Sequence, residues 1–503
     1  MNDLPEKLDV LIVGAGISGI GAACHLQQQC PDKKFAVIEA LNSFGGTWLT
    51  HRYPGIRSDS DLFTFGYRFK SWKGDPIATA DQILRYMGEV IEEHHLTEHI
   101  HYRHRVLSAG WSTAEGCWTV EIQLIDGLDA SPRIRHIRCT FLWMCQGYYR
   151  HEVGYTPEWP GMEHFAGRYV HPQKWPGDLN LKDKRVVVIG SGATAATLVP
   201  AIAGECEHVT MLQRSPTWFA TGHNSDELAD TLRELDIPHE WIHEIVRRKR
   251  LFDQAKLQRR CVQEPDAVAA ELLTAVKTAL GPKHEHLAAK HFTPHYRPWQ
   301  QRLAFVPDGD LFKALRAGQA SVATGQIKRF VSNGIELTSG ETLPADVVVT
   351  ATGFNLNVLG DIAFSVDEQP LAFERSITWH GAMFTGLPNL VWVFGYFRAS
   401  WTLRADLLGD LVCRLLQHMD KHGFRTVVPQ LRAQDQTMLL KPWIAPDNFN
   451  PGYLARSMHQ LPRQGDRAPW QHLQDYWREK DELPQVVLDD GTLIFDKPKP
   501  IVD

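Results

Sequence analysis

The 503-residue chain lacks three features that would point to particular classes of protein. Its formal net charge is -6 and no basic stripe dominates, which argues against a nucleic-acid partner. Its eight cysteines show no C-x-x-C spacing, so we predict neither a metal site nor a redox-active disulfide. Its apolar runs are short or interrupted, and residues 10–24 alone contain four glycines. We therefore predict no membrane span and no signal peptide, and the scattered cysteines fit reduced thiols in the cytoplasm.

The composition is that of a globular protein, with 43% hydrophobic and 22% charged residues. A chain of this length is expected to divide into about two to four domains. Apolar strands alternate with helical segments along the first 220 residues, which predicts an α/β fold.

A glycine loop follows the first apolar strand, residues 8–13. It reads Gly14-Ala-Gly-Ile-Ser-Gly19, it opens a helix, and the next strand ends in Glu39. Glycines let the backbone approach a pyrophosphate at the helix N-terminus, and an acid about twenty residues on can bind the ribose hydroxyls. We predict dinucleotide contacts from Gly14, Gly16, Ser18, Gly19 and Glu39. A purely structural turn is the alternative.

The same pattern returns after residues 185–189, as the loop Gly190-Ser-Gly-Ala-Thr-Ala195. Here the second strand ends without an acid, in Gln213-Arg214-Ser215. A carboxylate would repel a ribose 2′-phosphate, whereas arginine offers it charge-assisted hydrogen bonds. We predict NADPH rather than NADH; a solvated surface arginine is the alternative. The contacts expected are Gly190, Ser191, Gly192, Thr194, Ala195, Arg214 and Ser215.

Residues 165–176, between the two glycine loops, read F-x-G-x-x-x-H-x-x-x-W-P. Alone, His171 in such a loop is more often structural than functional. The pattern resembles the fingerprint of Baeyer–Villiger monooxygenases, flavoenzymes that insert oxygen next to a carbonyl. Related flavin-containing and N-hydroxylating enzymes usually carry Tyr or Phe where this chain has Trp175, followed by Pro176.

The resemblance implies that the first dinucleotide is FAD. Gly45-Gly-Thr-Trp48 resembles the family's FAD-binding segment, so Gly46, Thr47 and Trp48 are expected to contact it, with Val106 near the adenine. In the segment 52–59 the family's aspartate, Asp59, lies beside the flavin ring. By the same resemblance Asp59 orients Arg302, and Arg302 stabilises a C4a-peroxyflavin. Gln301 replaces a lysine that many members use for the 2′-phosphate. His171 is expected to couple domain rotation to NADP binding.

We predict two Rossmann-like domains. The FAD domain comprises residues 1–150 and, with a C-terminal cover that includes Asn450-Pro-Gly-Tyr453, residues 351–503. The NADPH domain comprises residues 151–350, with the fingerprint linker at 151–180 and a helical insertion at 223–290. The basic run 247–250 in that insertion is expected to be a solvated helix face.

The segments 52–65, 213–216 and 399–402 resemble the branch containing the mycobacterial monooxygenase that activates ethionamide. That branch implies a Baeyer–Villiger enzyme that uses FAD, NADPH and O2 to convert ketones, including linear ones, to esters, with thioether or thioamide oxidation as a side activity. The alternatives are an electrophilic S- or N-monooxygenase, an NADPH-dependent flavin reductase, and a nucleotide-sensing binding protein.

Overall fold

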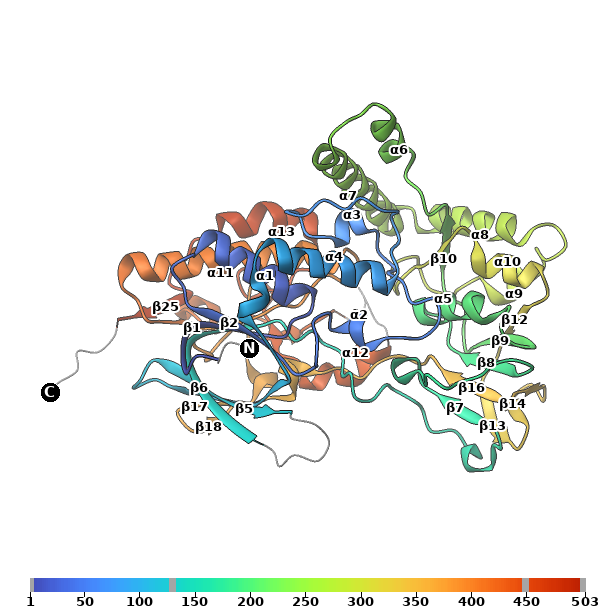
Figure 1. The fold of residues 1–503 in the computed structure, drawn as a ribbon, viewed down its shortest axis with the longest axis horizontal. Helices are drawn as coiled ribbons and strands as arrows, with labels where there is room; N and C mark the ends of the chain where they lie inside the picture. Colours follow the sequence, from blue (N-terminus) through green and yellow to red (C-terminus); the bar gives the residue numbers. More distant parts are fainter. Residues whose placement is uncertain (1–3, 126–132, 446–451, 498–503) are drawn as a thin grey trace.

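In the computed structural model, which describes residues 4–125, 133–445 and 452–497, the chain forms two α/β units side by side (Figure 1). The blue and red parts of the chain share the first unit, and the green and yellow parts form the second. The expected fold, with two Rossmann-like units, is confirmed. No helix among the described residues has the length and apolar character needed to cross a membrane.

The first unit is organised around a sheet to which both ends of the chain contribute. Its parallel centre places β1 between β2 and β6, and β21, from the C-terminal part, adds to β6 in parallel. On the other side β6, β5 and β4 are antiparallel, and β17 joins β4. The strands are β1 (Lys7–Val13), β2 (Phe35–Glu39), β3 (Ile100–Tyr102), β4 (His104–Ser112), β5 (Cys117–Leu124), β6 (Arg133–Met144), β17 (Ala363–Val366), β18 (Gln369–Pro370) and β21 (Leu390–Trp392).

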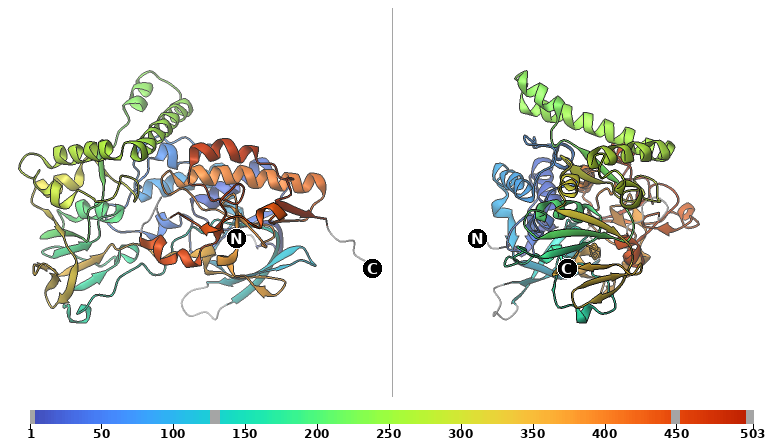
Figure 2. Two further views of the ribbon diagram at one scale, coloured as in Figure 1. Left: turned by 180° about the vertical axis from the view of Figure 1, so that it is seen from behind. Right: turned by 90° about the vertical axis from the view of Figure 1, so that its right-hand side faces the viewer.

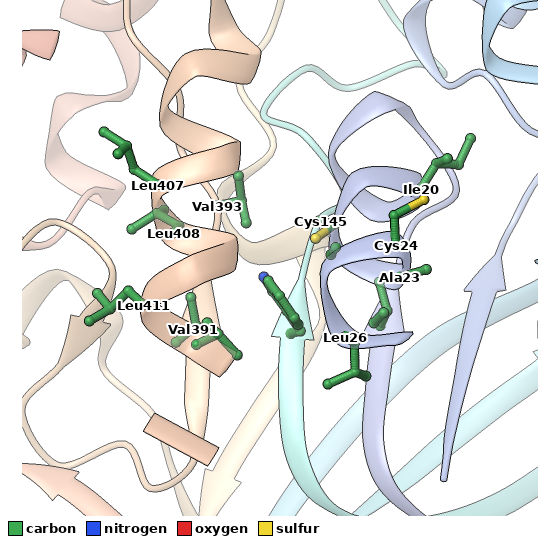
Figure 3. Close-up of a cluster of buried hydrophobic side chains, with 14 of the residues drawn as sticks. Ile20, Ala23, Cys24, Leu26, Cys145, Val391, Val393, Leu407, Leu408 and Leu411 are labelled. Carbon is green, nitrogen blue, oxygen red and sulfur yellow. The ribbon is translucent and has the colours of Figure 1, made fainter. Parts of the chain in front are cut away.

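Helices α1 (Ile17–Gln29) and α11 (Trp401–His422) cover one face of this sheet. Val391 and Val393 are drawn between the two helices in Figure 3, and they belong to the same buried cluster as Leu408 of α11 and the apolar residues of α1. Because α11 packs on α1, residues almost 400 positions apart form one core. This contact fixes the start of α11, at Trp401, close to the first glycine loop.

The second unit is a five-stranded parallel sheet in the order β12-β9-β8-β16-β7. Helix α5 (Ala193–Ile202) follows the second glycine loop. The fingerprint segment is more than a linker, because its residues Arg168–Val170 form edge strand β7. The remaining strands are β8 (Arg185–Ile189), β9 (His208–Gln213), β12 (Ala320–Thr324) and β16 (Val347–Thr350).

Within the described residues the chain passes from one unit to the other at two places, and these two segments lie against each other. Tyr155 N–H donates to Gly353 O at 3.1 Å, and Arg150 N–H donates to Asn355 O at 2.9 Å. Tyr149 and Leu356 form an antiparallel bridge in the same ribbon. The units are thus connected by one paired hinge ribbon, residues 148–157 and 350–357.

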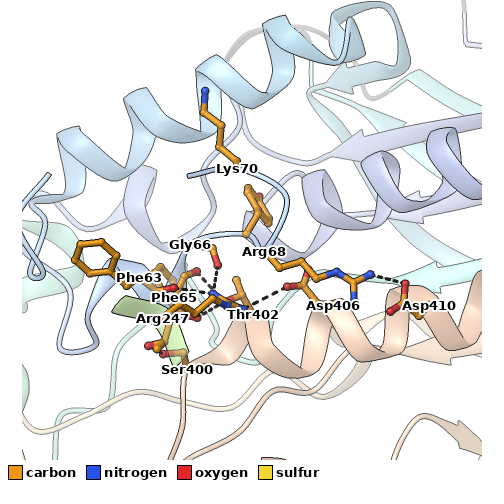
Figure 4. A network of polar contacts seen from close by, with 12 residues as sticks. Phe63, Phe65, Gly66, Arg68, Lys70, Arg247, Ser400, Thr402, Asp406 and Asp410 are labelled. Carbon is orange, nitrogen blue, oxygen red and sulfur yellow. Dashed lines mark hydrogen bonds and ion pairs between the residues drawn. The ribbon is translucent and has the colours of Figure 1, made fainter. Parts of the chain in front are cut away.

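The helical insertion consists of α6 (Glu227–Glu234), α7 (His239–Gln263), α8 (Pro265–Leu280) and α9 (Leu287–His291). The expectation that 247–250 is a solvated face is wrong for Arg247, which is 7% exposed. Its guanidinium donates to the carbonyls of Phe63 and Gly66 in the first unit, at 2.7 and 3.1 Å (Figure 4). It also lies 3.8 Å from Asp406 of α11. Helix periodicity cannot reveal that one arginine caps carbonyls of another unit.

The C-terminal part returns to the first unit. Arg404 of α11 is fully buried and pairs with Glu479 of α13 (Tyr476–Glu482) at 2.9 Å. Tyr396 also donates to Glu479. These contacts attach the C-terminal segment to the loop that precedes α11. Asn450 and Pro451 of the predicted cover lie outside the described residues.

Candidate active site

A cavity of about 870 Å³ lies where the two units meet. Residues of both glycine loops, of the hinge ribbon and of the start of α11 line it. The predicted residues that it brings together are Gly14, Gly16, Ser18, Glu39, Gly46, Thr47, Trp48, Asp59, Val106, Thr194 and Arg302. One cavity therefore brings together residues from positions 14 to 302.

Glu39 closes the part of the cavity beside the first loop. Its carboxylate accepts the N–H of Ala15 and the N–H of Leu41, both at 2.8 Å. Burial raises its pKa, and these backbone hydrogen bonds oppose the rise. The acid at the end of β2 is thus held rigidly against the glycine loop, at the edge where a ribose would lie.

Several buried polar atoms in the cavity wall have no partner among the described residues. They include both amide atoms of Gln146, Nε2 of His51 and Oδ1 of Asn357. Buried polar groups are almost always hydrogen-bonded, so these atoms indicate a polar ligand. Together with the open helix N-terminus at Gly16, they fit a dinucleotide such as FAD.

Arg302 and Asp59 form a two-pronged ion pair in the cavity. Arg302 Nε lies 2.7 Å from Asp59 Oδ2, and its Nη2 donates to Asp59 Oδ1 at 3.0 Å. Burial lowers the pKa of Arg302, but Asp59 and nearby phenols outweigh it, so the pKa is raised. The structure thus places a permanent cation, fixed in orientation by a carboxylate, on the cavity wall.

An aromatic wall, which the sequence analysis did not single out, surrounds this cation. Tyr148 and Tyr149 share a hydroxyl hydrogen bond of 2.6 Å, and Tyr148 stacks on Trp401 at 5.0 Å. Trp401 Nε1 donates to Ser18 in the first loop at 2.7 Å. Phe354 and Tyr453 complete the wall beside Tyr149. A possible signal was the pair of tyrosines directly after Gly147, where the closing strand of the first unit ends.

Two histidines in the cavity wall were also missed. His51 and His151 lie with ring centroids 6.3 Å apart. Burial lowers the pKa of both, and the neighbouring His51 helps to bring the pKa of His151 to about 4. Both are therefore neutral near pH 7, so neither histidine adds a positive charge to that of Arg302.

The second loop presents its predicted contacts outside this cavity, apart from Thr194. Ser191 Oγ lies 2.7 Å from Thr217 Oγ1 and 3.5 Å from the carbonyl of Ser215, so the loop lies next to the end of β9. Arg214 and Ser215 are exposed there. The helix N-terminus at Gly192 is open, because a Cβ built there meets no atom within 4 Å. This loop fits a second dinucleotide with the Arg214 charge at its ribose end.

His171 does not line the cavity. Its Nδ1 accepts the N–H of Gln173 at 3.2 Å. Burial lowers its pKa, while the backbone of Gly353 and Tyr155 opposes the decrease. His171 therefore lies as a neutral side chain against both segments of the hinge ribbon. Two further predicted contacts, Gly19 and Ala195, are packed inside their units, while Gly190 begins the second loop.

These features define a class of protein: a flavoprotein-like fold with a second dinucleotide unit and a cation-bearing cavity between the two. Residues 12–75 match the family described as NAD(P)-binding Rossmann-like domain, and residues 76–228 match the family described as flavin-binding monooxygenase-like.

Curated relatives extend this likeness over the full length. The chain is 44% identical to the FAD-containing monooxygenase EthA of Mycobacterium tuberculosis, over 99% of this chain and 100% of EthA. It is 43% identical to the probable FAD-binding monooxygenase AlmA of Acinetobacter baylyi, over 98% of this chain and 97% of AlmA. The chain belongs to this family of FAD-containing monooxygenases, so the predicted family, branch and enzyme class are confirmed.

Solved structures share the fold at lower identity. A steroid monooxygenase bound to NADP superimposes with a TM-score of 0.74 at 20% identity, over 98% of this chain and 100% of that chain. A cyclohexanone monooxygenase with bound ε-caprolactone gives 0.73 at 18% identity, over 97% of this chain and 100% of that chain. The prediction of FAD and NADPH agrees with the names of these relatives and neighbours.

Proposed function

We propose that the protein is a Baeyer–Villiger monooxygenase that uses FAD, NADPH and O2 to convert ketones, including linear ones, to esters. Thioether or thioamide oxidation is its side activity. The observation that carries the proposal is the Arg302–Asp59 pair on the wall of the cavity between the two dinucleotide loops. The fold neighbours include a cyclohexanone monooxygenase, which supports a ketone as substrate.

When FAD is bound, it supplies the activation of O2. The protein supplies a fixed positive charge where negative charge develops on oxygen. A preorganised cation lowers the free energy of an oxyanion more than water does, because it need not reorient during the reaction. Asp59 holds the guanidinium through two hydrogen bonds, so the Arg302 charge is positioned before substrate enters.

The aromatic wall supports a mainly apolar substrate. Tyr148, Tyr149 and Trp401 present rings to the cavity, while their polar atoms are engaged with each other and with Ser18. An aromatic surface of this kind binds the apolar part of a ketone through burial and excludes water from the reacting oxygen.

NADPH is assigned to the second loop, with Arg214 at the 2′-phosphate. His171 acts on the hinge ribbon rather than on the substrate, because it touches both ribbon segments and lies outside the cavity. We propose that it couples NADPH binding to the relative rotation of the units. A location in the cytoplasm stays a prediction.

The test is product analysis with isotopic O2. The FAD-loaded enzyme receives NADPH, a linear methyl ketone and a thioether, and labelled ester is expected as the main product. Arg302→Ala should reduce ester formation by at least about 100-fold, the loss typical of one oxyanion-stabilising group. Arg138→Ala, which breaks an exposed arginine–glutamate pair in the first unit, is the matched control and should keep full activity.

Three outcomes would overturn the proposal. Labelled sulfoxide without ester would assign the protein to the electrophilic oxygenases. Hydrogen peroxide with neither product, across a panel of ketones and thioethers, would favour a flavin reductase. Undiminished ester formation by Arg302→Ala would remove the role of the cation.

A further inference from the structure

The outer face of α7 carries large apolar side chains that no other described part of the chain covers. Trp241 and Phe252 are 64% and 63% exposed, and Ile245 between them is 37% exposed. At 3.6 residues per turn these three positions share one face of the helix. Soluble proteins rarely leave such a row of large apolar side chains in water, and contiguous exposed apolar surface usually marks an interaction site.

Basic residues lie on the same face. Arg248 lies on this face between Ile245 and Phe252, Lys256 and Arg259 continue the face beyond Phe252, and all three are exposed. We call these six residues the α7 stripe. The helix has seven basic and three acidic residues, so its net charge is +4 in a chain whose net charge is -6. Of the acids that border the stripe, Glu244 pairs with Arg248 and Asp253 pairs with Lys249.

The position of α7 in the molecule leaves this face accessible. Helices α6 and α7 project from the body in Figure 1, and α7 runs along the outer edge in both views of Figure 2. The opposite face of α7 is buried through Ile242, Val246 and Arg247. The helix is therefore anchored on one side and free to meet a partner on the other.

We propose that the α7 stripe docks the enzyme on an anionic lipid surface. Tryptophan and phenylalanine insert at the boundary between headgroups and acyl chains, and flanking Lys and Arg side chains reach the lipid phosphates. Pairing of two copies through this face would bring basic residues together. Charge complementarity therefore favours the membrane over a second copy of the chain.

The inner face of the same helix contacts residues that are adjacent in sequence to residues lining the cavity. Gln258 donates to the carbonyl of Arg398 at 2.5 Å, and Gln254 donates to Asp61 at 3.2 Å. Ala399, next to Arg398, and Trp401, the first residue of α11, both line the cavity. Docking through α7 thus holds the cavity near the lipid surface, where apolar substrates concentrate. The docking itself does not depend on which substrate class the enzyme oxidises.

The test is flotation of the FAD-loaded, full-length enzyme with vesicles. Binding is expected to vesicles of phosphatidylcholine with phosphatidylglycerol, and to weaken with added salt. The double variant Trp241→Ser/Phe252→Ser should lose binding by about tenfold or more. Leu439→Ser, a change at an equally exposed (64%) apolar residue outside α7, is the matched control and should bind like the wild type.

FAD content and melting temperature show that each variant is folded, and both should be unchanged because the stripe faces solvent. Arg248→Gln/Lys256→Gln/Arg259→Gln should weaken binding and reduce its salt dependence. The proposal fails if the wild type does not float with anionic vesicles, or if it floats equally with pure phosphatidylcholine. It also fails if Leu439→Ser loses as much binding as the double variant. If the double variant instead converts a dimer to a monomer, the stripe is a contact between copies.

Discussion

The two dinucleotide units use nearly the same backbone to build sites of different character. The helix-capping glycines adopt almost identical conformations, with φ -77° and ψ -173° at Gly16 and φ -77° and ψ -171° at Gly192. Gly14 and Gly190 both have positive φ, 104° and 137°. The loops therefore share one way of exposing a helix N-terminus to a phosphate.

The two units differ at the end of the strand that follows the first helix, which is β2 in the first unit and β9 in the second. Glu39 turns toward its loop and accepts the N–H of Ala15, whereas Gln213, in the corresponding place, turns away. Gln213 donates to the carbonyl of His291 and to Thr324, at 2.7 and 2.9 Å. The first site is closed by a fixed acid, while the second is left open with an exposed arginine. This difference suits a cofactor that stays bound and one that exchanges.

The largest expected effect on stability comes from a substitution at Gly19, the third glycine of the first loop. A Cβ at Gly19 would lie 1.8 Å from the carbonyl oxygen of Gly14, so Gly19→Ala must displace the first helix from its loop. We expect destabilisation of about 3 kcal/mol and loss of bound FAD. Ala195→Gly in the second unit should cost only about 1 kcal/mol, from helix propensity. Melting temperature and the FAD content of the purified variants measure both. Equal effects of the two changes would show that the helices pack alike.

The next largest expected effect is on nucleotide preference, from a substitution at Arg214 in the open site of the second unit. Arg214→Ala removes charge-assisted hydrogen bonds to a 2′-phosphate, each worth about 1.5–3 kcal/mol. The ratio of kcat/KM for NADPH over NADH should therefore fall about 10- to 100-fold. Arg329→Ala, which breaks an exposed ion pair with Glu336 in the same unit, is the control and should leave the ratio unchanged. An unaltered ratio in Arg214→Ala would contradict the assignment of the phosphate site.

The smallest expected effect is on the stability of the protein at acid pH. Hydrogen bonds from Arg185 bring the pKa of Asp346 in the second unit down to about 2. A carboxylate with a depressed folded pKa stabilises above its unfolded pKa, and this contribution is lost as the pH falls through the folded pKa. Asp346→Asn should therefore lower stability by up to about 1 kcal/mol at neutral pH, because the pair is partly exposed. The difference from wild type should shrink below about pH 4.

Glu39 is predicted to behave in the opposite sense in the first unit. Burial raises its folded pKa, so its contribution to stability is largest below its unfolded pKa and falls as the pH rises through the folded value.

Urea unfolding of wild type and Asp346→Asn across acid pH checks the sign of the effect of Asp346 in the second unit. A difference that grows on acidification would contradict the Arg185–Asp346 account.

The glycine loops and their strands could be predicted from sequence because their signals are local. Lys7 to Glu39 forms one strand–helix–strand unit, and its glycines and its acid stand where the backbone and the ligand of such a unit require them. Arg302 and Asp59 are different, since 243 residues separate them. Only the family resemblance predicted that they meet, because no spacing rule relates positions in separate units.

Other features arise only from tertiary packing. Arg247 looks like its neighbours Arg248 and Lys249 in sequence, yet it is buried because α7 lies on carbonyls of residues 63–66. Tyr148 and Trp401 stack because α11 begins beside the first loop, a contact set by the packing of α11 on α1. Residues brought together by such contacts carry no common pattern along the chain.

The most direct test of the account is the anaerobic reduction of the bound flavin. If the closed unit holds FAD and the open unit delivers NADPH, then adding NADPH without oxygen should bleach the flavin absorbance rapidly. NADH should bleach it much more slowly, because it lacks the 2′-phosphate that Arg214 is proposed to bind. Failure of NADPH to bleach the flavin, or equal rates with the two nucleotides, would contradict the central claim.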